Sequence, residues 1–398
     1  MQKILFVITS LSGGGAERII SNLTTGFPPE WEIDILIARK DSTMYPHRGN
    51  LFSIDIKDGS NRNNLLYRIR VLLKKYIMLR NLKKKGGYTA CVSFMTRSNI
   101  LNVLTGNKRC KTIVSVRCDG RHNKYKRSKD KVESYLNGKA DFVISISNGV
   151  REHLINNVGL PPKKVKTIYN GFDVNNYIHG KPLQSEIAKL ISVQDSFTFI
   201  TAGRLTSQKN QWHLIRVFAH LSKRHPKCSL IILGEGELRP YLEELVSDFG
   251  VEANVHFAGF VENTFDYYRE ASAFVFTSLW EGFGNVLIEA MMCGLPVIST
   301  DCHSGPREIL APTTDVSFQN KGCIEYADYG ILVPPCSGVR HGADAPLELQ
   351  EQLLLDAMEK IINDDDMRES YVEQSRKRAG DFAIEKIVGI WTEVIEGI

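Results

Sequence analysis

The stretch Ser278–Gly294, Ser-Leu-Trp-Glu-Gly-Phe-Gly-Asn-Val-Leu-Ile-Glu-Ala-Met-Met-Cys-Gly, decides the fold. Short apolar runs of strand length precede and follow it, so it is predicted to be a strand-to-helix crossover. Its turn at 281–284 contains two glycines, which leaves backbone N–H groups free to approach a phosphate at the positive end of a helix. We therefore expect this crossover to form half of a nucleotide site.

Two acidic residues of this stretch are candidate ligands for hydroxyl groups. Glu289 lies in the middle of a helix that is apolar on nearly every side, so its carboxylate is expected to be buried and to need hydrogen-bond donors. The two hydroxyls of a ribose would serve, and Glu281 could accept from the hydroxyls of a second polyol. The alternative, in which Glu289 pairs with a buried arginine and Glu281 is a solvated loop residue, fits this stretch equally well.

The composition predicts an ordinary soluble protein with two domains. The chain has 398 residues, more than one hydrophobic core usually organises. Its 43% hydrophobic and 24% charged residues exclude disorder. The eight cysteines include no C-x-x-C pair and predict reduced thiols in a cytosolic protein. The N-terminal apolar run is too short for a signal peptide and no run reaches transmembrane length, so we expect a protein that is neither secreted nor membrane-spanning.

The positive charge is concentrated in one block. The net charge is only +5, but between Arg62 and Lys85 there are nine basic residues and no Asp or Glu. Residues 64–85 have apolar positions near helical spacing and are predicted to form a basic amphipathic helix with the cations on the complementary face. This helix is either a solvated helix packed on its domain or a docking surface for anionic lipid or a lipid-linked diphosphate. The basic segment 121–131 is predicted to be a loop facing the same anionic partner.

Alternating strand-like and helix-like segments predict two α/β domains with a cleft between them. The first set of strand-like runs is Lys3–Thr9, Trp31–Ala38, Cys91–Phe94, Thr112–Val116 and Phe142–Ile146. After a linker-like segment at 170–194, the second set is Phe197–Ala202, Ser229–Leu233, Val255–Ala258, Phe274–Thr277 and Val297–Thr300. Segments 311–329 and 336–345 are expected to be irregular and at the surface. Arg117 lies just past a strand end, where ligands of open α/β sheets gather, so it is a candidate substrate contact.

The second half of the nucleotide site is predicted in the loop that follows Phe197–Ala202. Arg204 and Lys209 lie there five residues apart and could grip a diphosphate from two sides. Gly234 and the pair Phe260–Val261 follow the next two strands, so the strand ends together describe one ligand pocket.

A glycine loop at 12–17 follows the first strand. It lacks the third glycine of the NAD fingerprint, and no Walker A sequence, H-E-x-x-H motif or zinc spacing occurs in the chain. A glycine loop that lets a diphosphate or a substrate approach the backbone from the opposing domain fits better.

The sequence resembles the retaining glycosyltransferases of family 4, which have the GT-B fold of two Rossmann-like domains. The resemblance rests on Gly13-Gly14-Gly15-Ala-Glu-Arg, Gly203-Arg204 with Lys209, and Glu281 with Glu289, and it spans nearly the whole chain. The segment from Asp301 to Ile309 is also similar to members that build O-antigen, capsule and lipid-linked oligosaccharides. The resemblance implies an N-terminal acceptor domain (1–178), a C-terminal donor domain (179–381), and a final helix (382–398) that packs back on the first domain.

The resemblance also implies roles for individual residues. Arg204 and Lys209 would hold the donor diphosphate and stabilise the leaving nucleoside diphosphate without a metal or other cofactor. Glu289 would bind the ribose. Glu281 and the amides of the turn would position the sugar. The remaining donor-site and acceptor-side contacts would come from Gly14, Gly15, Gly234, Phe260, Val261, Gly282, Phe283, Gly284 and Asn285. Arg117 stands where many relatives carry a His or another polar residue, which leaves its role open.

The resulting prediction is a retaining hexosyltransferase at the inner face of the cytoplasmic membrane. It would transfer a hexose or N-acetylhexosamine from a UDP-sugar to a polyprenyl-diphosphate-linked or other membrane-associated glycan in lipopolysaccharide, O-antigen or related polysaccharide assembly. No nucleic acid partner is expected. Two alternatives remain: a UDP-sugar epimerase of the same fold, and a non-catalytic nucleotide-binding membrane scaffold, which the presence of all four charged motif residues disfavours.

Overall fold

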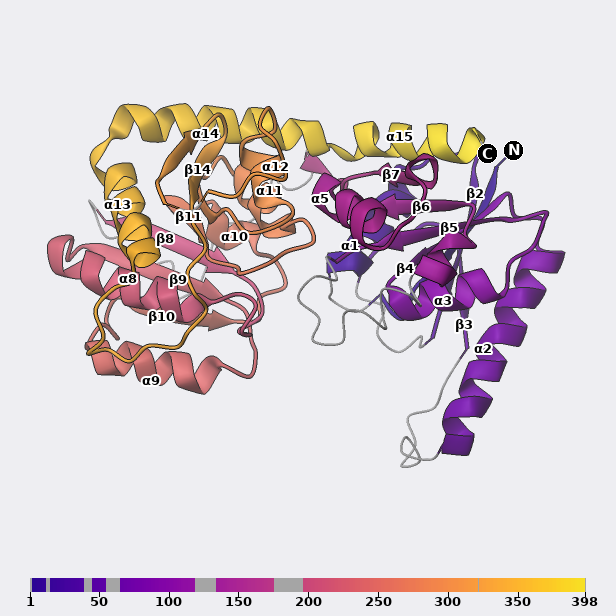
Figure 1. Ribbon diagram of the computed structural model, residues 1–398, viewed down its shortest axis with the longest axis horizontal. Helices are drawn as coiled ribbons and strands as arrows, with labels where there is room; N and C mark the ends of the chain where they lie inside the picture. Colours follow the sequence, from indigo (N-terminus) through magenta and orange to yellow (C-terminus); the bar gives the residue numbers. More distant parts are fainter. Residues whose placement is uncertain are drawn as a thin grey trace. The chain divides into compact units, whose positions relative to one another are not determined.

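The computed structural model describes residues 2–11, 15–38, 45–54, 65–118, 134–174, 196–320 and 322–397. The chain divides into two compact units, Met1–Asp173 with Phe382–Ile398 and Val174–Asp381. Each unit has its own sheet (Figure 1). Each also has its own buried hydrophobic core. Each therefore has the content of a separate domain.

The first unit is an α/β domain with a seven-stranded sheet in the order β3-β2-β1-β4-β5-β6-β7. Its strands are β1 (Lys3–Val7), β2 (Glu32–Ile37), β3 (Asn50–Ser53), β4 (Ala90–Phe94), β5 (Lys111–Val116), β6 (Phe142–Ser145) and β7 (Val165–Thr167). Its helices are α1 (Gly15–Gly26), α2 (Leu65–Lys85), α3 (Thr96–Leu104) and α5 (Asn148–Glu152), with a π-helical turn at His153–Asn157, a 3-10 turn at Pro162–Lys164 and the C-terminal α15 (Ile384–Glu396). All neighbouring strands pair in parallel, and most of their side chains are buried, as expected for a sheet covered on both faces.

The C-terminal helix α15 completes the core of the first unit. Its apolar side chains, including Ile384 and Trp391, are buried among residues of α1 and the sheet. Phe172 and Ile384 are joined by a backbone hydrogen bond of 2.8 Å, and a side chain at Gly171 would come within 2.6 Å of Ile384. The predicted return of the final helix to the N-terminal domain is confirmed.

The second unit repeats the architecture, with a seven-stranded sheet in the order β10-β9-β8-β11-β12-β14-β13. Its strands are β8 (Phe197–Ala202), β9 (Cys228–Leu233), β10 (Val255–Gly259), β11 (Ala273–Phe276), β12 (Val297–Thr300), β13 (Glu325–Ala327) and β14 (Gly330–Val333). Its helices are α8 (Gln211–Arg224), α9 (Arg239–Phe249), α10 (Phe265–Tyr268), α11 (Asn285–Met292), α12 (Pro306–Leu310), α13 (Leu349–Asn363) and α14 (Asp365–Ala379), followed by a 3-10 turn at Gly380–Phe382. The edge strand β13 pairs antiparallel to β14, and the other pairs are parallel.

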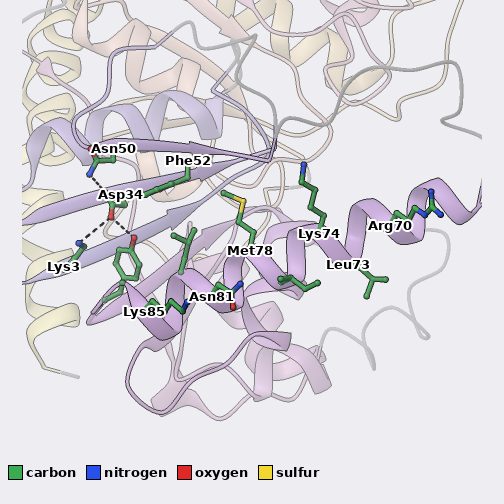
Figure 2. Close-up of a pocket in the computed structure, with 14 residues that line it drawn as sticks. Lys3, Asp34, Asn50, Phe52, Arg70, Leu73, Lys74, Met78, Asn81 and Lys85 are labelled. Carbon is green, nitrogen blue, oxygen red and sulfur yellow. Dashed lines mark hydrogen bonds and ion pairs between the residues drawn. The ribbon is translucent and has the colours of Figure 1, made fainter.

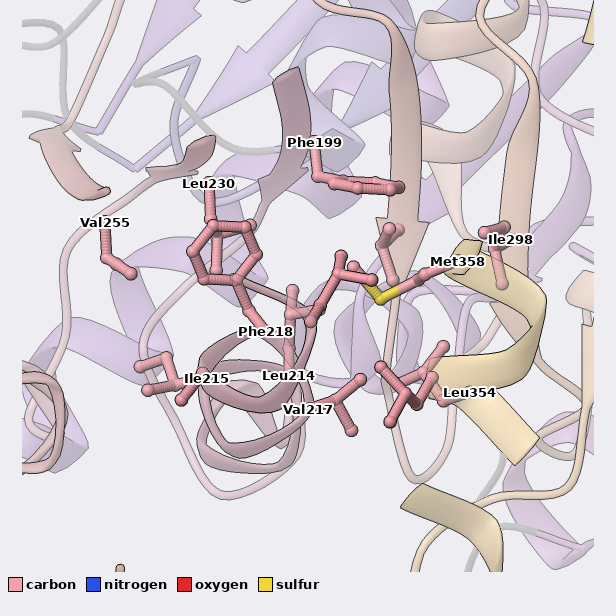
Figure 3. Packing of buried hydrophobic residues seen from close by; sticks show 14 of the residues in the cluster. Phe199, Leu214, Ile215, Val217, Phe218, Leu230, Val255, Ile298, Leu354 and Met358 are labelled. Carbon is pink, nitrogen blue, oxygen red and sulfur yellow. The ribbon is translucent and has the colours of Figure 1, made fainter. Parts of the chain in front are cut away.

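The core of the second unit lies between the sheet and helices α8 and α13. Figure 3 shows Phe199 of β8 and Phe218 of α8 packed with Met358 of α13, and all three side chains are fully buried. The apolar side chains of the strands and the apolar face of α8 thus bury one another.

All ten predicted strands are present, with ends that differ by at most two residues. Strands β3, β7, β13 and β14, of three or four residues each, were not predicted. The segment 311–329 was expected to be irregular but contains β13. The expected linker at 170–194 begins too early, since Asn170 and Phe172 are buried in the first unit, and residues 175–194 lie outside the described part of the chain. The basic segment 121–131 also lies outside it.

Helix α2 agrees with its predicted range but not with its predicted faces. Lys83 is only 2% exposed, and its ammonium group donates to Asn102 O at 2.9 Å and to Thr112 Oγ1 at 3.2 Å. Conversely, Leu72 is 61% and Ile77 54% exposed. The predicted cationic face is therefore wrong at Lys83, and the exposed surface of α2 carries both cationic and apolar side chains. Within the described residues, no helix is long and apolar enough to span a bilayer.

Candidate functional site

The centre of the candidate site is an ion pair between Lys209 and Glu281. Lys209 follows β8 and Glu281 follows β11, and β8 lies between β9 and β11, where the strand order reverses. Ligands of open α/β sheets bind at such a switch point, outside the carboxyl ends of the strands. The Lys209 Nζ to Glu281 Oε1 distance is 2.5 Å, and the side chains are 17% and 10% exposed. The structure therefore brings together two of the predicted catalytic residues.

Hydrogen bonds between the two loops hold this pair in place. Thr277 Oγ1 donates to Lys209 O at 3.0 Å, Leu279 N donates to Gln208 O at 2.9 Å, and the Gln208 amide donates to Trp280 O at 2.8 Å. The Lys209 ammonium also lies 5.0 Å from the ring centre of Phe276. The position of the lysine is thus set by the backbone of the facing loop as well as by Glu281.

Arg204 lies on the same loop as Lys209 but has a different environment. Its side chain is exposed, and the structure gives its guanidinium no partner among the described residues. Its carbonyl accepts from the Gln211 side chain at 3.2 Å. Arg204 thus presents an exposed guanidinium group on the same loop as Lys209, whose ammonium group is already paired with Glu281.

Asn210 is a residue of this loop that sequence reasoning did not select. It adopts a left-handed conformation with φ of 60° and is fully buried. Neither its side-chain nitrogen nor its oxygen has a hydrogen-bond partner among the described residues. The sequence could have indicated Asn210, because it directly follows Lys209 and Asn is one of the few residues that tolerate this backbone conformation.

The glycine turn opens helix α11 as predicted. Gly284 has φ of 96° and is the residue before the first turn, and the adjacent Phe283 is buried while Gly282 and Asn285 are half-buried. Glu289 is buried in α11 at 6% exposure, and Thr264 Oγ1 lies 3.4 Å from its Oε2. The prediction that this carboxylate is buried in an apolar helix is confirmed.

The ends of β9 and β10 lie beside the Arg204 loop. Gly203 N donates to Leu233 O at 3.0 Å, and Gly234 N donates to Gly259 O at 2.7 Å. A Cβ at Gly234 would lie 2.1 Å from Gly203 O, so only glycine fits there. Phe260 is 61% exposed just past β10, and Val261 is half-buried. An exposed aromatic ring at this edge suits stacking on a planar group.

The predicted acceptor-side residues lie in the first unit. Gly15 is the exposed first residue of α1, and Gly14 lies outside the described residues. Arg117 follows β5, donates to Asn170 Oδ1 at 2.6 Å, and lies 5.4 Å from the ring centre of Phe94. Burial lowers the pKa of Arg117 to about 10, and the Glu17 carboxylate opposes that shift. Arg117 therefore stays charged at neutral pH and is held by its own unit.

A pocket of about 400 Å³ lies at the carboxyl ends of β1 and β2, between them and helices α2 and α3. Three cations line it, Arg68 and Lys75 from α2 and Arg97 from α3. Arg97 was not predicted, although it follows β4 just as Arg117 follows β5, so the same strand-end argument would have found it. Such a basic pocket suits a phosphate or diphosphate group.

A second pocket, of about 860 Å³, lies on the other side of α2. Figure 2 shows Leu73, Lys74 and Met78 of this helix projecting from it, with Phe52 of β3 on the opposite side. Its polar end is formed by Asp34, which accepts hydrogen bonds from Tyr88 at 2.6 Å and from Asn50 at 2.8 Å. Along α2 the pocket is lined by apolar side chains, including Leu73 and Met78, and by the cations Arg70, Lys74 and Lys85.

Comparisons with known proteins agree with this geometry. The family described as "Glycosyltransferase Family 4" matches residues 13–176, and "Glycosyl transferases group 1" matches residues 184–325. An uncharacterized glycosyltransferase of Methanocaldococcus jannaschii is 41% identical over 239 residues, which are 59% of this chain and only 58% of that relative.

Two further relatives cover the chain almost completely. The N-acetylgalactosamine-N,N'-diacetylbacillosaminyl-diphospho-undecaprenol 4-alpha-N-acetylgalactosaminyltransferase of Campylobacter jejuni is 29% identical over 97% of both chains. The crystal structure of Anabaena HepE in complex with UDP and glucose superposes with a TM-score of 0.76 over 100% of both chains at 20% identity.

The two α/β units and the returning C-terminal helix are those of the GT-B fold. The two matched families follow one another along the chain and account for both units. The chain belongs to the family 4 glycosyltransferases.

Proposed function

We propose that this glycosyltransferase moves a hexose or N-acetylhexosamine from a UDP-sugar, with retention, onto a polyprenyl-diphosphate-linked or other membrane-associated glycan. The observation that supports it most is the Lys209–Glu281 pair at the switch point of the second sheet, with the exposed guanidinium of Arg204 on the same loop. A cation beside a carboxylate matches a ligand that carries a diphosphate next to a polyol.

The chemistry follows from the charges that develop during transfer. The bond between the anomeric carbon and the donor phosphate oxygen breaks, which leaves negative charge on the nucleoside diphosphate. Lys209 and Arg204 stabilise this charge, and fixed donors of this kind each contribute a few kcal/mol. The acceptor oxygen attacks the anomeric carbon from the same face, and its proton passes to the departing phosphate oxygen. No side-chain acid is needed for this route.

The remaining residues of the second unit bind the donor. Glu289 accepts from the ribose hydroxyls, and Glu281 accepts from the sugar while it orients Lys209. The amides at the start of α11 bind phosphate oxygens at the positive end of the helix. Phe260 and Val261 line the base.

The acceptor binds through the first unit. The Campylobacter jejuni relative, by its name, elongates a diphospho-undecaprenol-linked glycan, and it aligns with 97% of this chain. We place the acceptor diphosphate at the pocket lined by Arg68, Lys75 and Arg97, because three cations converge there beside apolar side chains of α2. Gly15 and Arg117 contact the acceptor glycan.

Helix α2 docks this enzyme on an anionic membrane. The cations with exposed side chains on the helix are Arg68, Arg70, Lys74, Arg80, Lys84 and Lys85. They share its surface with the exposed Leu73 and Ile77. Apolar side chains that enter the interface and cations that attract anionic lipid act together in such helices.

The activity is tested with the full-length protein, the donors UDP-N-acetylgalactosamine, UDP-galactose and UDP-glucose, and a synthetic polyprenyl-diphosphate-linked acceptor. We expect an acceptor product enlarged by a single sugar in mass spectrometry, with an α-anomeric linkage by NMR. No turnover of any UDP-sugar with such acceptors would contradict the proposal. A product formed from UDP-N-acetylglucosamine without acceptor would instead identify an epimerase.

Membrane docking is tested by co-sedimentation with vesicles that contain anionic phospholipid. The double variant Lys84→Ala/Lys85→Ala removes two cations worth about 1 kcal/mol each at a membrane surface, so binding should fall by roughly 30-fold. Lys83 is left intact because it is buried. Lys108→Ala/Lys163→Ala is the matched control, since both lysines are exposed in the same unit and outside α2. Equal binding of both double variants would show that α2 is only a solvated helix.

A further inference from the structure

A cluster of side chains with metal-binding chemistry lies in the second unit, between α8 and the segment that joins β14 to α13. Within the described residues, His213 of α8, Cys336 and Glu348 place one potential ligand atom each within 4.8 Å of one another. Cys336 is buried at 5% exposure. A thiol, an imidazole and a carboxylate together are a donor set that suits Zn²⁺.

His213 is oriented as a metal-binding histidine is. Its side chain is fully buried, and its Nδ1 lies 2.7 Å from Glu351 Oε1. Its other ring nitrogen, Nε2, has no hydrogen-bond partner among the described residues. Metal-ligating histidines usually place one ring nitrogen against a carboxylate and offer the other to the ion. Arg216 holds the same carboxylate at 2.7 Å, so the ring has a supported orientation.

Glu348 and His341 complete the donor set. Glu348 is the residue that caps the start of α13, and its carboxylate accepts from Ser337 N at 3.0 Å, from the Ser337 hydroxyl and from His341 Nε2 at 2.8 Å. The rings of His341 and His213 have their centres 6.3 Å apart. His341 therefore offers a fourth donor atom, a second imidazole nitrogen, next to Glu348.

We propose that His213, Cys336, His341 and Glu348 form a structural zinc site. In a tetrahedral site with the usual bond lengths, thiolate sulfur and imidazole nitrogen are about 3.5 Å apart. The ligand atoms of His213, Cys336 and Glu348 lie within 4.8 Å of one another, so these three side chains need to close in by up to about 1.3 Å, and His341 follows from its contact with Glu348. Cys336 binds as the thiolate and releases its proton to solvent, while His341 exchanges its hydrogen bond to Glu348 for the ion. His213 lies more than 100 residues before the other three ligands, so the four do not form a recognisable zinc motif in the sequence.

The site would support the donor-binding loop without taking part in the transfer. The segment between Cys336 and His341 contacts the loop of Arg204 and Lys209 through Arg340, which donates to Ser207 Oγ at 3.3 Å. It also contacts the start of α8, where Trp212 Nε1 donates to Val339 O at 3.1 Å. An ion that ties this segment to α8 and α13 would hold Ser207, which lies between the two proposed diphosphate ligands. The metal ion would thus stabilise the position of the loop that contains Arg204 and Lys209.

The test uses the full-length protein purified without chelator. Elemental analysis should find stoichiometric zinc, and replacement by Co²⁺ should give the visible absorption of a tetrahedral ion together with a thiolate-to-cobalt charge-transfer band. Cys336→Ser should abolish that band and weaken Co²⁺ binding at least about 100-fold, a loss no smaller than that caused by removing an outer-shell partner. The matched control Cys228→Ser replaces another buried free cysteine and should retain the band.

A second measurement covers the case in which Cys336→Ser does not fold. In the unaltered protein, added Zn²⁺ should raise the melting temperature and protect Cys336 from maleimide labelling, as read by peptide mass spectrometry. Glu348→Gln should lose both effects while keeping its circular dichroism spectrum. Absence of stoichiometric metal with no Co²⁺ band, a band that persists in Cys336→Ser, or a Cys336 labelled equally fast with and without Zn²⁺ would each overturn the proposal.

Discussion

Replacement of Lys209 by methionine separates the chemical role of the lysine from its role in stability. The Lys209 ammonium lies 2.5 Å from the Glu281 carboxylate, and methionine keeps the unbranched side chain, one atom shorter, without the charge. If Lys209 stabilises the leaving diphosphate, loss of this one fixed donor should lower kcat by about 100- to 1,000-fold, or roughly 3–4 kcal/mol.

The same substitution leaves the largely buried Glu281 carboxylate without its cation. We expect a loss of about 1–3 kcal/mol in the free energy of unfolding, towards the lower end because the carboxylate keeps 10% exposure. The double variant Lys209→Met/Glu281→Gln should recover part of this stability and none of the activity. The loss in the free energy of unfolding is measured by urea denaturation, in which the dependence of that free energy on urea concentration should be unchanged.

The assay is release of nucleoside diphosphate at saturating donor and acceptor. Lys223→Met, at an exposed lysine on α8, is the matched control and should turn over at the normal rate. A folded Lys209→Met enzyme that keeps kcat within a few-fold of the unaltered protein would refute the assigned role, since no other cation pairs with Glu281 among the described residues.

Three further predictions address single features. Glu289→Gln should raise KM for the donor by roughly 10- to 100-fold through the loss of charged hydrogen bonds to the ribose, whereas an unchanged KM would place the ribose elsewhere. Lys83→Met should lower the free energy of unfolding by about 1–3 kcal/mol because its buried partners lose their donor, and an unchanged urea midpoint would contradict this. Burial raises the pKa of Cys228 to about 11, so at pH 7 a disulfide reagent should label the exposed Cys323 and spare Cys228. The pKa of Cys228 is higher in the folded protein than the value of about 8.5 in the unfolded chain. The neutral thiol therefore contributes to stability below a pH of about 8.5, and this contribution is lost as the pH rises to about 11. Denaturation measured as a function of pH would detect the loss.

The rule that loops at the carboxyl ends of neighbouring parallel strands meet predicted which loops lie together, because it depends only on the order of the strands. Lys209 and Glu281 follow β8 and β11, and parallel strands present their carboxyl ends at one edge, so any residues in those loops are neighbours once the strands pair. The same reasoning applied to β4 would have found Arg97. Helix α2 shows where periodicity fails, because spacing cannot tell which face of a helix meets the sheet. Lys83 is buried because Asn102 and Thr112 offer it acceptors, and both lie on other elements.

By itself the sequence determined the two α/β domains, the burial of Glu289, and the family, because apolar runs, glycine turns and charged loop motifs are local along the chain. Tertiary structure alone decided which side chains interact directly. The Lys209–Glu281 pair and the group formed by His213, Cys336 and Glu348 join residues far apart in sequence. The physical reason is that interactions between charges and ligand atoms depend on distances of a few ångströms, and those distances are set by strand order and by the packing of helices on the sheet.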